Sequence, residues 1–316
     1  MKRAWVIGAG GLLGSALCRA LRNDEISLFT FEDRFAWGDE PVLLAQIRNA
    51  VQAFAAEVGP GDQWEVYWAA GRGTMGSTEA SLQLETRALA AALSALGKAD
   101  SLRLAQGSFA FASSAGAIYA GSKDEVITEN STVTPTTGYA REKIQQEETI
   151  RLFAEVHGNV AVLIARFSTL YGTGQSTRKQ QGLLTHIAAS ILRNKPVQIY
   201  VPFDTIRDYI AVDDAAAAMI TSIQAIRLAP RLVTKIIASE QPTTIAEIVA
   251  IFKRNARRSP LVVTSASQLS SLYSRRVQFR SEVLRDETKK HHRSLLVGIA
   301  QLLDAERKSY VRSAQS

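Results

Sequence analysis

The chain contains little of what disulfide-stapled, metal-dependent or membrane-spanning proteins need. Its single cysteine, Cys18, excludes an intrachain disulfide and is typical of a reducing compartment, so we expect a cytoplasmic protein. No apolar run reaches the roughly 18 residues that cross a bilayer, so we expect no membrane partner. The four histidines are scattered without ligand spacing, which predicts no metal site. A hydrophobic content of 46% and a charged content of 21% are typical of an ordinary globular protein.

Positive charge is concentrated near the end of the chain. Residues 252–312 contain 14 lysines and arginines against 5 acidic residues, although the net charge of the whole chain is only +7. These cations alternate with apolar residues that predict strands and helices, so they do not form the charged tail typical of nucleic-acid binding. We therefore expect a folded basic lobe that receives an anionic small molecule, and no nucleic-acid partner.

The first two thirds of the chain alternate between predicted strands and predicted helices. The strands are short runs rich in valine, isoleucine, phenylalanine and alanine, as expected where a parallel sheet is covered on both faces. They are expected at Ala4–Gly8, Ile26–Phe31, Glu65–Ala69, Ser108–Ser113, Val160–Arg166 and Lys235–Ala238, and the helices at Leu12–Leu21, Val42–Val58, Ser81–Leu96 and Thr137–Val156. This alternation predicts an α/β fold with a doubly wound parallel sheet of the Rossmann type.

Glycines at positions 8, 10, 11 and 14 separate the first strand from the first helix. In a dinucleotide site the first glycine makes a tight turn, the second lets the pyrophosphate approach the backbone, and the third lets helix and strand pack closely. The spacing fits Gly8, Gly11 and Gly14 as readily as a triplet through Gly10. These glycines also interrupt the basic and then apolar start of the chain, which disfavours a signal peptide.

The second predicted strand is followed by Glu32, Asp33 and Arg34. An acidic residue about 20 positions after a glycine loop binds the ribose hydroxyls of NAD, and Glu32 fits that place. Arg34 is equally placed to meet the extra phosphate of NADP. The sequence favours NAD and leaves NADP open.

A tyrosine and a lysine, Tyr139 and Lys143, stand four residues apart in a predicted helix. Positions i and i+4 share one helical face, so the Lys143 ammonium is expected beside the Tyr139 ring. A phenol titrates near pH 10 in water, and a neighbouring cation favours its phenolate. Such a pair is a candidate general acid/base for a hydroxyl or carbonyl oxygen, although the same pattern also occurs in helices without function.

Taken together, these motifs resemble the extended short-chain dehydrogenase/reductase superfamily, and more narrowly the NAD-dependent epimerase/dehydratase family of nucleotide-sugar type. Phe109–Tyr119 is similar to the family's strand-end segment, with Ser114 25 residues before Tyr139. Trp68–Gly71 resembles the turn beneath the cofactor. Ile164–Gly172 is similar to an arginine-led segment near the nicotinamide and substrate. Ile206–Asp214 resembles the family's Arg-Asp-Tyr-Ile-His-Val-x-Asp signature.

The resemblance implies a role for each matching residue. Tyr139 would be the general acid or base, Lys143 would lower the pKa of Tyr139 and bind the nicotinamide ribose, and Ser114 would bind the reacting oxygen. Thr169, Arg207 and Arg276 would contact the substrate, with Arg275 as an alternative second clamp. The expected cofactor contacts are Gly8, Gly11, Leu13, Gly14, Glu32, Arg34, Ala69, Ala70, Gly71 and Phe167.

Two departures from the family narrow the expected reaction. Ala115 and Gly116 follow Ser114 where the family's 4,6-dehydratases carry an Asp-Glu pair, so water elimination is disfavoured. Thr169 stands where many of the sugar-nucleotide enzymes have an asparagine. Epimerisation or net reduction of a nucleotide sugar stays open, as do turnover of another alcohol or ketone and a non-catalytic, NAD(P)-sensing role. The resemblance also implies a homodimer.

The same argument predicts the domain organisation. Residues 1–171, with a return segment at 206–239, are expected to form the dinucleotide-binding domain. Residues 172–205 and 240–316 are expected to form a smaller, discontinuous substrate lobe. Within the return segment, Asp213 is expected to cap the start of a helix.

Overall fold

A single parallel sheet organises most of the molecule. The computed structural model describes residues 1–74, 76–174, 182–227, 232–264, 275–284 and 292–315. Six parallel strands lie in the order β2-β1-β3-β4-β5-β9. Their bounds are β1 Lys2–Ile7, β2 Ser27–Phe29, β3 Gln63–Trp68, β4 Gln106–Ser114, β5 Val160–Phe167 and β9 Leu232–Ile237. The order reverses between β1 and β3, as in doubly wound folds, so the predicted fold class is confirmed.

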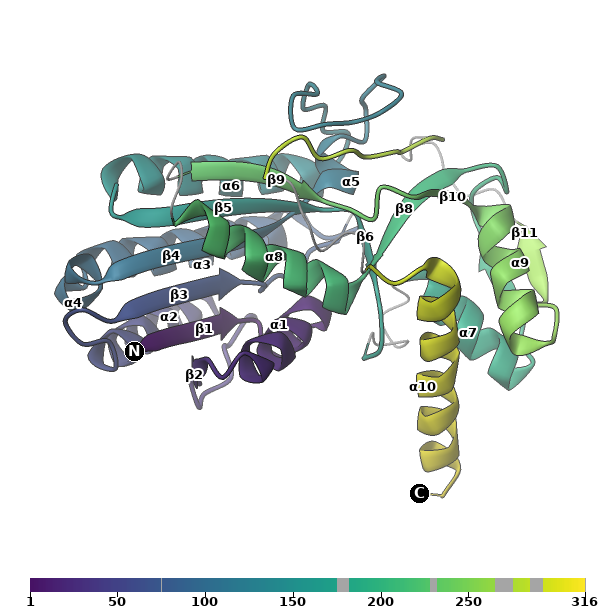
Figure 1. Ribbon diagram of the computed structural model, residues 1–316, viewed down its shortest axis with the longest axis horizontal. Coiled ribbons are helices and arrows are strands. Elements are labelled where there is room, and N and C mark those ends of the chain that lie inside the picture. The colour runs from purple at the N-terminus through teal and green to yellow at the C-terminus, as the bar shows by residue number, and fades with distance from the viewer. Residues whose placement is uncertain (75, 175–181, 228–231, 265–274, 285–291, 316) are drawn as a thin grey trace.

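Helices cover both faces of this sheet (Figure 1). On one face lie α1 (Leu12–Asn23) and α8 (Val212–Ile226), and on the other lie α2 (Glu40–Ala56), α3 (Glu79–Lys98) and α6 (Gly138–Val156). Two short helices, α4 (Asp100–Leu104) and α5 (Ala115–Ile118), flank β4. All residues of β5 are buried, because this strand lies inside the sheet and is covered on both sides.

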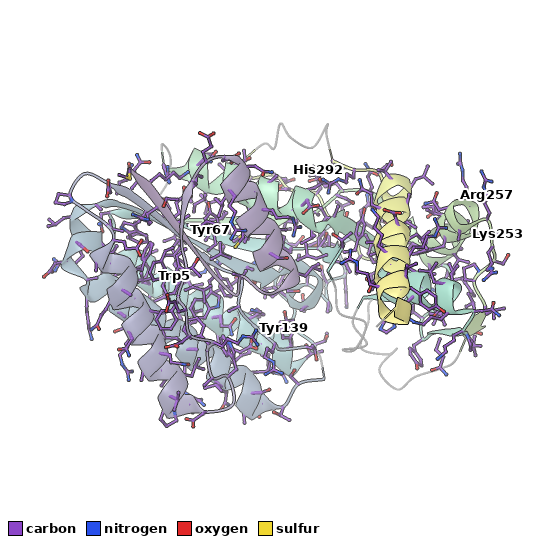
Figure 2. The ribbon with its side chains drawn as sticks, turned by 90° about the horizontal axis from the view of Figure 1, so that it is seen from below. Trp5, Tyr67, Tyr139, Lys253, Arg257 and His292 are labelled. Atoms are coloured by element: carbon purple, nitrogen blue, oxygen red, sulfur yellow. The ribbon has the colours of Figure 1, made fainter. Side chains whose placement is uncertain are left out.

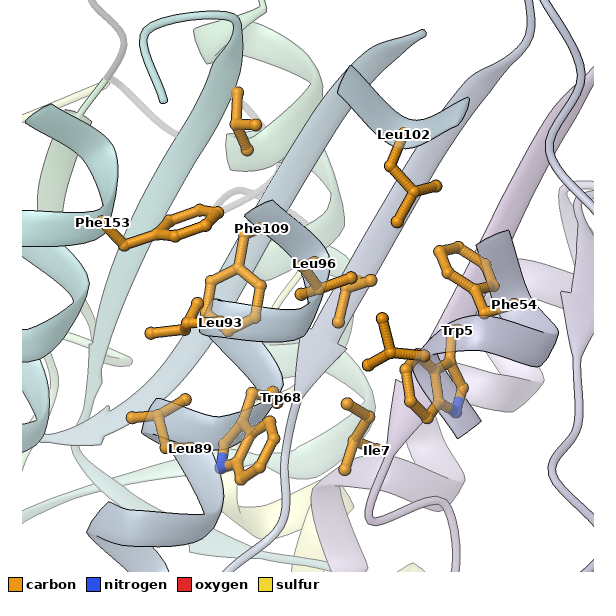
Figure 3. Close-up of a cluster of buried hydrophobic side chains, with 14 of the residues drawn as sticks. Trp5, Ile7, Phe54, Trp68, Leu89, Leu93, Leu96, Leu102, Phe109 and Phe153 are labelled. Carbon is orange, nitrogen blue, oxygen red and sulfur yellow. The ribbon is translucent and has the colours of Figure 1, made fainter. Parts of the chain in front are cut away.

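Large aromatic side chains fill the core between the sheet and α2 and α3. Figure 3 shows Trp5, Phe54, Trp68 and Phe109 in one continuous cluster with leucines of α3. The Trp5 and Phe29 rings meet edge to face, with centroids 5.4 Å apart. Edge-to-face packing is a preferred arrangement of aromatic rings, and here it ties the edge strand β2 to β1. Only three residues of β2 pair with β1, so this strand is shorter than the predicted Ile26–Phe31.

A second, smaller lobe has its own sheets and core. Its elements are β6 Thr169–Tyr171, α7 Leu183–Arg193, β7 Val197–Ile199, β8 Ile206–Ala211, β10 Pro242–Thr244, α9 Ile245–Ala256, β11 Val262–Thr264 and α10 Leu295–Gln315. The strands form the sheets β10-β8-β6 and β11-β7. Helices α7, α9 and α10 pack around them, on the right of Figure 1. A capping box starts α9: Glu247 N–H donates to Thr244 Oγ1 at 3.1 Å, and Thr244 N–H donates back to Glu247 Oε2 at 2.7 Å.

The expected cap at Asp213 is wrong. Helix α8 begins at Val212 with Ala211 at its cap position, so Asp213 lies in the first helical turn. There its carboxylate meets Arg19 at 2.5 Å and Arg293 at 3.1 Å. A carboxylate in the first turn is favourable because it faces the positive end of the helix dipole. Here it also links α8 to α1 and to the start of the C-terminal helix region.

Candidate active site

The glycine loop between β1 and α1 is a turn that only glycine can make. Gly8 has a φ of +95°, and the Gly11 N–H donates to its carbonyl at 2.9 Å. A Cβ at Gly14 would lie 2.0 Å from the Gly8 oxygen, and one at Gly8 would lie 2.7 Å from the backbone of Ala69. The loop therefore packs directly against the turn after β3. Gly11 caps α1 without a side-chain hydrogen bond, so the first N–H groups of the helix are open to an anion.

One cavity at the carboxyl ends of the strands collects half of the predicted site residues. It has a volume of about 230 Å³. Eight predicted residues line it: Leu13, Ala69, Ala70, Gly71, Ser114, Tyr139, Lys143 and Phe167. Figure 2 shows Tyr139 in the main lobe, at the side that faces the smaller lobe. Clefts outside the carboxyl ends of parallel strands are the usual ligand sites of this fold type, so this cavity is the candidate active site.

Tyr139 enters the cavity from the first turn of α6. The helix starts there because the Thr137 hydroxyl accepts the Ala140 N–H at 3.1 Å. Burial, together with the Glu85 carboxylate, raises the pKa of Tyr139 to about 12, although a hydrogen bond with Ser114 acts in the opposite direction. In the chain by itself the Tyr139 pKa is thus raised, which is opposite to the lowering expected from Lys143. Tyr139 is a phenol at neutral pH, ready to donate a proton or a hydrogen bond.

Lys143 lies one turn further along α6 and is almost fully enclosed, with 6% of its surface exposed. Its Nζ donates to Gln146 Oε1 at 2.9 Å and lies 4.8 Å from the centre of the Phe111 ring and 5.9 Å from that of Tyr139. Burial lowers the pKa of Lys143, while the carboxylates of Glu85, Glu147 and Glu142 oppose that lowering. The predicted pair is therefore adjacent, but the ammonium is turned toward Gln146.

A buried ion pair fixes the helix that carries both residues. Arg166 on β5 donates to Glu147 on α6 through Nε at 2.9 Å and Nη2 at 2.6 Å. Ser113 donates to the same carboxylate at 2.6 Å, and Tyr119 meets the Arg166 guanidinium. Such a two-pronged, fully satisfied pair fixes orientation. Arg166 was expected near the nicotinamide and substrate; instead it is committed to holding α6 against the sheet.

Eight predicted residues lie outside the cavity lining: Gly8, Gly11 and Gly14 of the glycine loop, and Glu32, Arg34, Thr169, Arg207 and Arg276. Glu32 and Arg34 are exposed in the loop after β2. Thr169 is also exposed, whereas its neighbours Ser168 and Leu170 line the cavity. The alternation of side chains along an extended segment explains this difference.

The two predicted arginine clamps occupy neighbouring positions in the smaller lobe. Arg207 lies on β8, and a bridge pairs Ile206 with Arg276. Arg275, the alternative clamp, is ion-paired with Asp204. Much of the remaining positive charge is remote: Figure 2 shows Lys253 and Arg257 on the outer part of the smaller lobe, far from Tyr139. Asp286, which the sequence places near this clamp, lies outside the described residues.

Sequence reasoning missed six residues that line the cavity: Gly73, Glu85, Ala112, Ser113, Ser168 and Leu170. Among them Glu85 had a readable signal. It lies three residues after Leu82 and four before Leu89, both on the buried stripe of α3. A carboxylate on the apolar stripe of a helix needs a compensating partner, and that need marks it as a site candidate.

A buried tyrosine beside the arginine clamp makes stability sensitive to alkaline pH. Tyr209 on β8 is 8% exposed, and burial raises its pKa to about 12. The pKa of Tyr209 in the folded protein lies above its unfolded value near 10. The contribution of this tyrosine to the free energy of unfolding is therefore complete below pH 10 and is lost as the pH rises toward 12. Between these limits the unfolding free energy of the wild type should fall by about 2 kcal/mol more than that of Tyr209→Phe. Urea titrations across this range check the difference, with the exposed Tyr200→Phe as a control that should follow the wild type.

Comparison with known proteins identifies the family. The model of the NAD dependent epimerase/dehydratase family matches residues 4–234. The chain belongs to this family. Among curated family relatives, a putative UDP-glucose 4-epimerase of Methanocaldococcus jannaschii is 29% identical over 113 residues, which is 36% of this chain and 37% of the relative. A dTDP-4-dehydro-6-deoxyglucose reductase of Escherichia coli is 31% identical over 115 residues, covering 36% of this chain and 35% of the relative.

The matched segments thus span about a third of these two relatives. Among solved structures of the epimerase type, UDP-glucose 4-epimerase of Thermotoga maritima with UDP-glucose superposes with a TM-score of 0.77. Identity is 17%, and the superposition covers 98% of this chain and 100% of that one. At this identity the likeness establishes a shared fold that includes the smaller lobe.

The described residues of this epimerase/dehydratase family member lack two kinds of feature, membrane-spanning helices and metal-binding clusters. Across the described residues, no helix combines the length and apolarity needed to cross a membrane. Nor do those residues contain a group of three or more His, Cys, Asp or Glu side chains placed to hold a metal ion.

Proposed function

We propose that this protein is an NAD(P)-dependent epimerase or reductase of a nucleotide-linked sugar, with Tyr139 as general acid/base. The observation that carries the proposal is that Ser114, Tyr139 and Lys143 meet in one cavity. The wall of this cavity also includes the Ala69–Gly71 turn after β3, against which the glycine loop packs. The family relationship and the named sugar-nucleotide relatives support the same substrate class. Epimerisation is favoured over dehydration because no acid-base pair follows Ser114.

The residues present fit the dinucleotide that the family description implies. The open N-terminus of α1 suits a pyrophosphate, and Gly8, Gly11 and Gly14 leave no side chain over it. Leu13, Phe167 and the Ala69–Gly71 turn would hold the nicotinamide end, since all of them line the cavity. Glu32 would bind the adenosine ribose of NAD, and Arg34 leaves NADP open. When bound, the nicotinamide supplies the acceptor or donor of a hydride.

The side chains supply binding, orientation and proton transfer. Ser114 would hydrogen-bond the reacting sugar oxygen, and Tyr139 would take its proton or return it through Oη. Acting as a base requires the Tyr139 pKa to fall from about 12, and a turn of the Lys143 ammonium from Gln146 toward the phenol would act in that direction. We infer that Lys143 makes this turn when its ribose partner is present.

The smaller lobe is the proposed home of the nucleotide part of the substrate. Arg207 and Arg276 would face the diphosphate, because a guanidinium fork matches phosphate oxygens. Thr169 would contact the sugar from the exposed side of β6. The division into residues 1–171 with 206–239 and residues 172–205 with 240–316 stays a prediction, and the sheet β10-β8-β6 joins segments from both of its parts. A homodimer and a cytoplasmic location also stay predictions.

Three alternatives stay open, and net reduction has specific support. Net reduction is favoured by the Escherichia coli relative, whose name describes reduction of a keto sugar nucleotide. A non-nucleotide alcohol or ketone as substrate, or an NAD(P)-sensing role without catalysis, would fit if Arg207 served only the fold. Retention of Ser114, Tyr139 and Lys143 in one cavity favours an enzyme over a sensor.

The test combines cofactor analysis with substrate turnover. Mass spectrometry of the nucleotide carried through purification should detect retained NAD, and incubation with UDP-glucose should then yield a stereoisomer without net NADH. Consumption of NADPH with a keto sugar nucleotide would assign the reductase alternative. Absence of reaction with UDP- and dTDP-sugars, under conditions where simple ketones are reduced, would overturn the substrate assignment.

A further inference from the structure

A buried carboxylate that the proposed mechanism does not use lies in the wall of the cavity. Glu85 is on the second turn of α3 and is 6% exposed. Its Oε1 accepts the Gly73 N–H at 2.8 Å and also the Arg72 N–H. Its Oε2 would stand 3.2 Å from a Cβ at Gly71. Glu85 therefore holds the 71–73 turn in the wall of the cavity.

The position of Glu85 is costly unless its charge is matched. It lies on the apolar stripe of α3, where an unpaired carboxylate destabilises the fold. Two backbone N–H groups satisfy one oxygen, but they carry no net charge. The cation in the same cavity wall is the buried Lys143 ammonium, which donates a hydrogen bond to the neutral Gln146 side chain.

Other charges around Lys143 are already engaged. On α6, Glu147 is held by Arg166 of β5, and Glu142 accepts the Thr86 hydroxyl from α3. Ser114, at the end of β4, contributes only a hydroxyl. Glu85 has the strongest charge effect on Lys143 among its neighbours and also acts on Tyr139, raising the pKa of both groups.

We propose that Glu85 is a positioning residue of this site, which holds the 71–73 turn over the cavity with one oxygen and keeps the enclosed Lys143 side chain in its ammonium form with its charge. This role deepens the proposed function and rests on it only for the consequence on turnover. After burial, the charge on Glu85 is the main influence on the pKa of Lys143 and of Tyr139, and it raises both. The turn contacts give Glu85 a structural role that can be separated from its charge.

Two substitutions separate these roles. Glu85→Gln keeps an oxygen that accepts both N–H donors but removes the charge. Glu85→Asp keeps the charge and shortens the reach to the turn. Glu79→Gln removes an exposed carboxylate from the first turn of the same helix and is the matched control.

The direct measurement is the pH dependence of Lys143 acetylation by acetic anhydride, followed by mass spectrometry of the peptide that contains it. Only the neutral amine reacts, so in Glu85→Gln the midpoint should move down by about one pH unit, a roughly tenfold gain in labelling at a fixed lower pH. Glu85→Asp should restore the wild-type midpoint, and Glu79→Gln should not change it. An unchanged midpoint in a folded Glu85→Gln protein would overturn the proposal.

Turnover provides the second readout. Removing the charge lowers the pKa of Tyr139 and of Lys143 together, so the pH optimum of kcat should move down in Glu85→Gln. A purely structural role would lower kcat equally at every pH, and that result would contradict the proposal. The labelling experiment needs no substrate, so failure of the sugar-nucleotide assignment would leave its outcome readable.

Discussion

Replacing Tyr139 by phenylalanine should lower kcat by about 10²–10⁴-fold, the usual contribution of a positioned general acid/base. The ring would still fill its place beside Gly73, so the fold should persist. What disappears is the hydroxyl that exchanges the proton and the hydrogen bond with Ser114. Steady-state turnover of the sugar nucleotide, together with calorimetric titration of NAD, measures the effect.

The affinity for NAD should stay at the wild-type level. A loss confined to kcat would identify Tyr139 as a group that acts in the transition state. Tyr310→Phe is the matched control: it removes a phenol hydroxyl from the exposed part of α10 and should leave kcat unchanged. Wild-type kcat in Tyr139→Phe would remove this residue from the mechanism.

Adding a single methyl group to the glycine loop should have the largest effect on stability. In Gly14→Ala the new Cβ would lie 2.0 Å from the Gly8 oxygen and 2.7 Å from its carbonyl carbon. Both atoms are backbone, so the strand-to-helix turn itself would have to move. We expect a loss of about 3 kcal/mol in the free energy of unfolding, accompanied by loss of NAD binding because the same turn forms the phosphate site.

The neighbouring Gly10 offers a control within the same loop. A Cβ there meets no atom within 4 Å, so Gly10→Ala should unfold at the wild-type urea concentration. Urea denaturation of the two variants measures the contrast. Equal midpoints for Gly14→Ala and Gly10→Ala would show that the loop does not pack as tightly as described.

Local pattern was sufficient for the sheet. An apolar run such as Val160–Phe167 can be buried only where both faces are covered, so its place inside a parallel sheet followed from its composition. The edge strand was less well predicted. Only three residues of this edge strand are paired, and β1 continues through Val6 and Ile7 with β3 as its neighbour.

The positions of the main site residues were predicted from the sequence, but the charge interactions between them were not. Spacing placed Tyr139 and Lys143 on one face, but the direction of the Lys143 side chain depends on Gln146, and the pKa of Tyr139 depends on Glu85 from another helix. Glu85 acts from another helix, so the Tyr139–Lys143 motif by itself does not predict its effect. Thr169 was predicted, whereas its neighbours Ser168 and Leu170 line the cavity, because one step along an extended segment turns a side chain to the opposite side.

The passage of the chain between the two lobes has a mechanical consequence. Ser168 alone separates β5 of the main sheet from β6 of the smaller sheet, and α8 follows β8 with no residue between them. Independent domains are usually joined by flexible linkers, but these two connections are too short to be flexible. Ser168 is also part of the cavity wall. The cavity thus lies at the pivot between the lobes. A rotation of the smaller lobe about these connections would move the distant α9 far more than the backbone that positions the reacting groups.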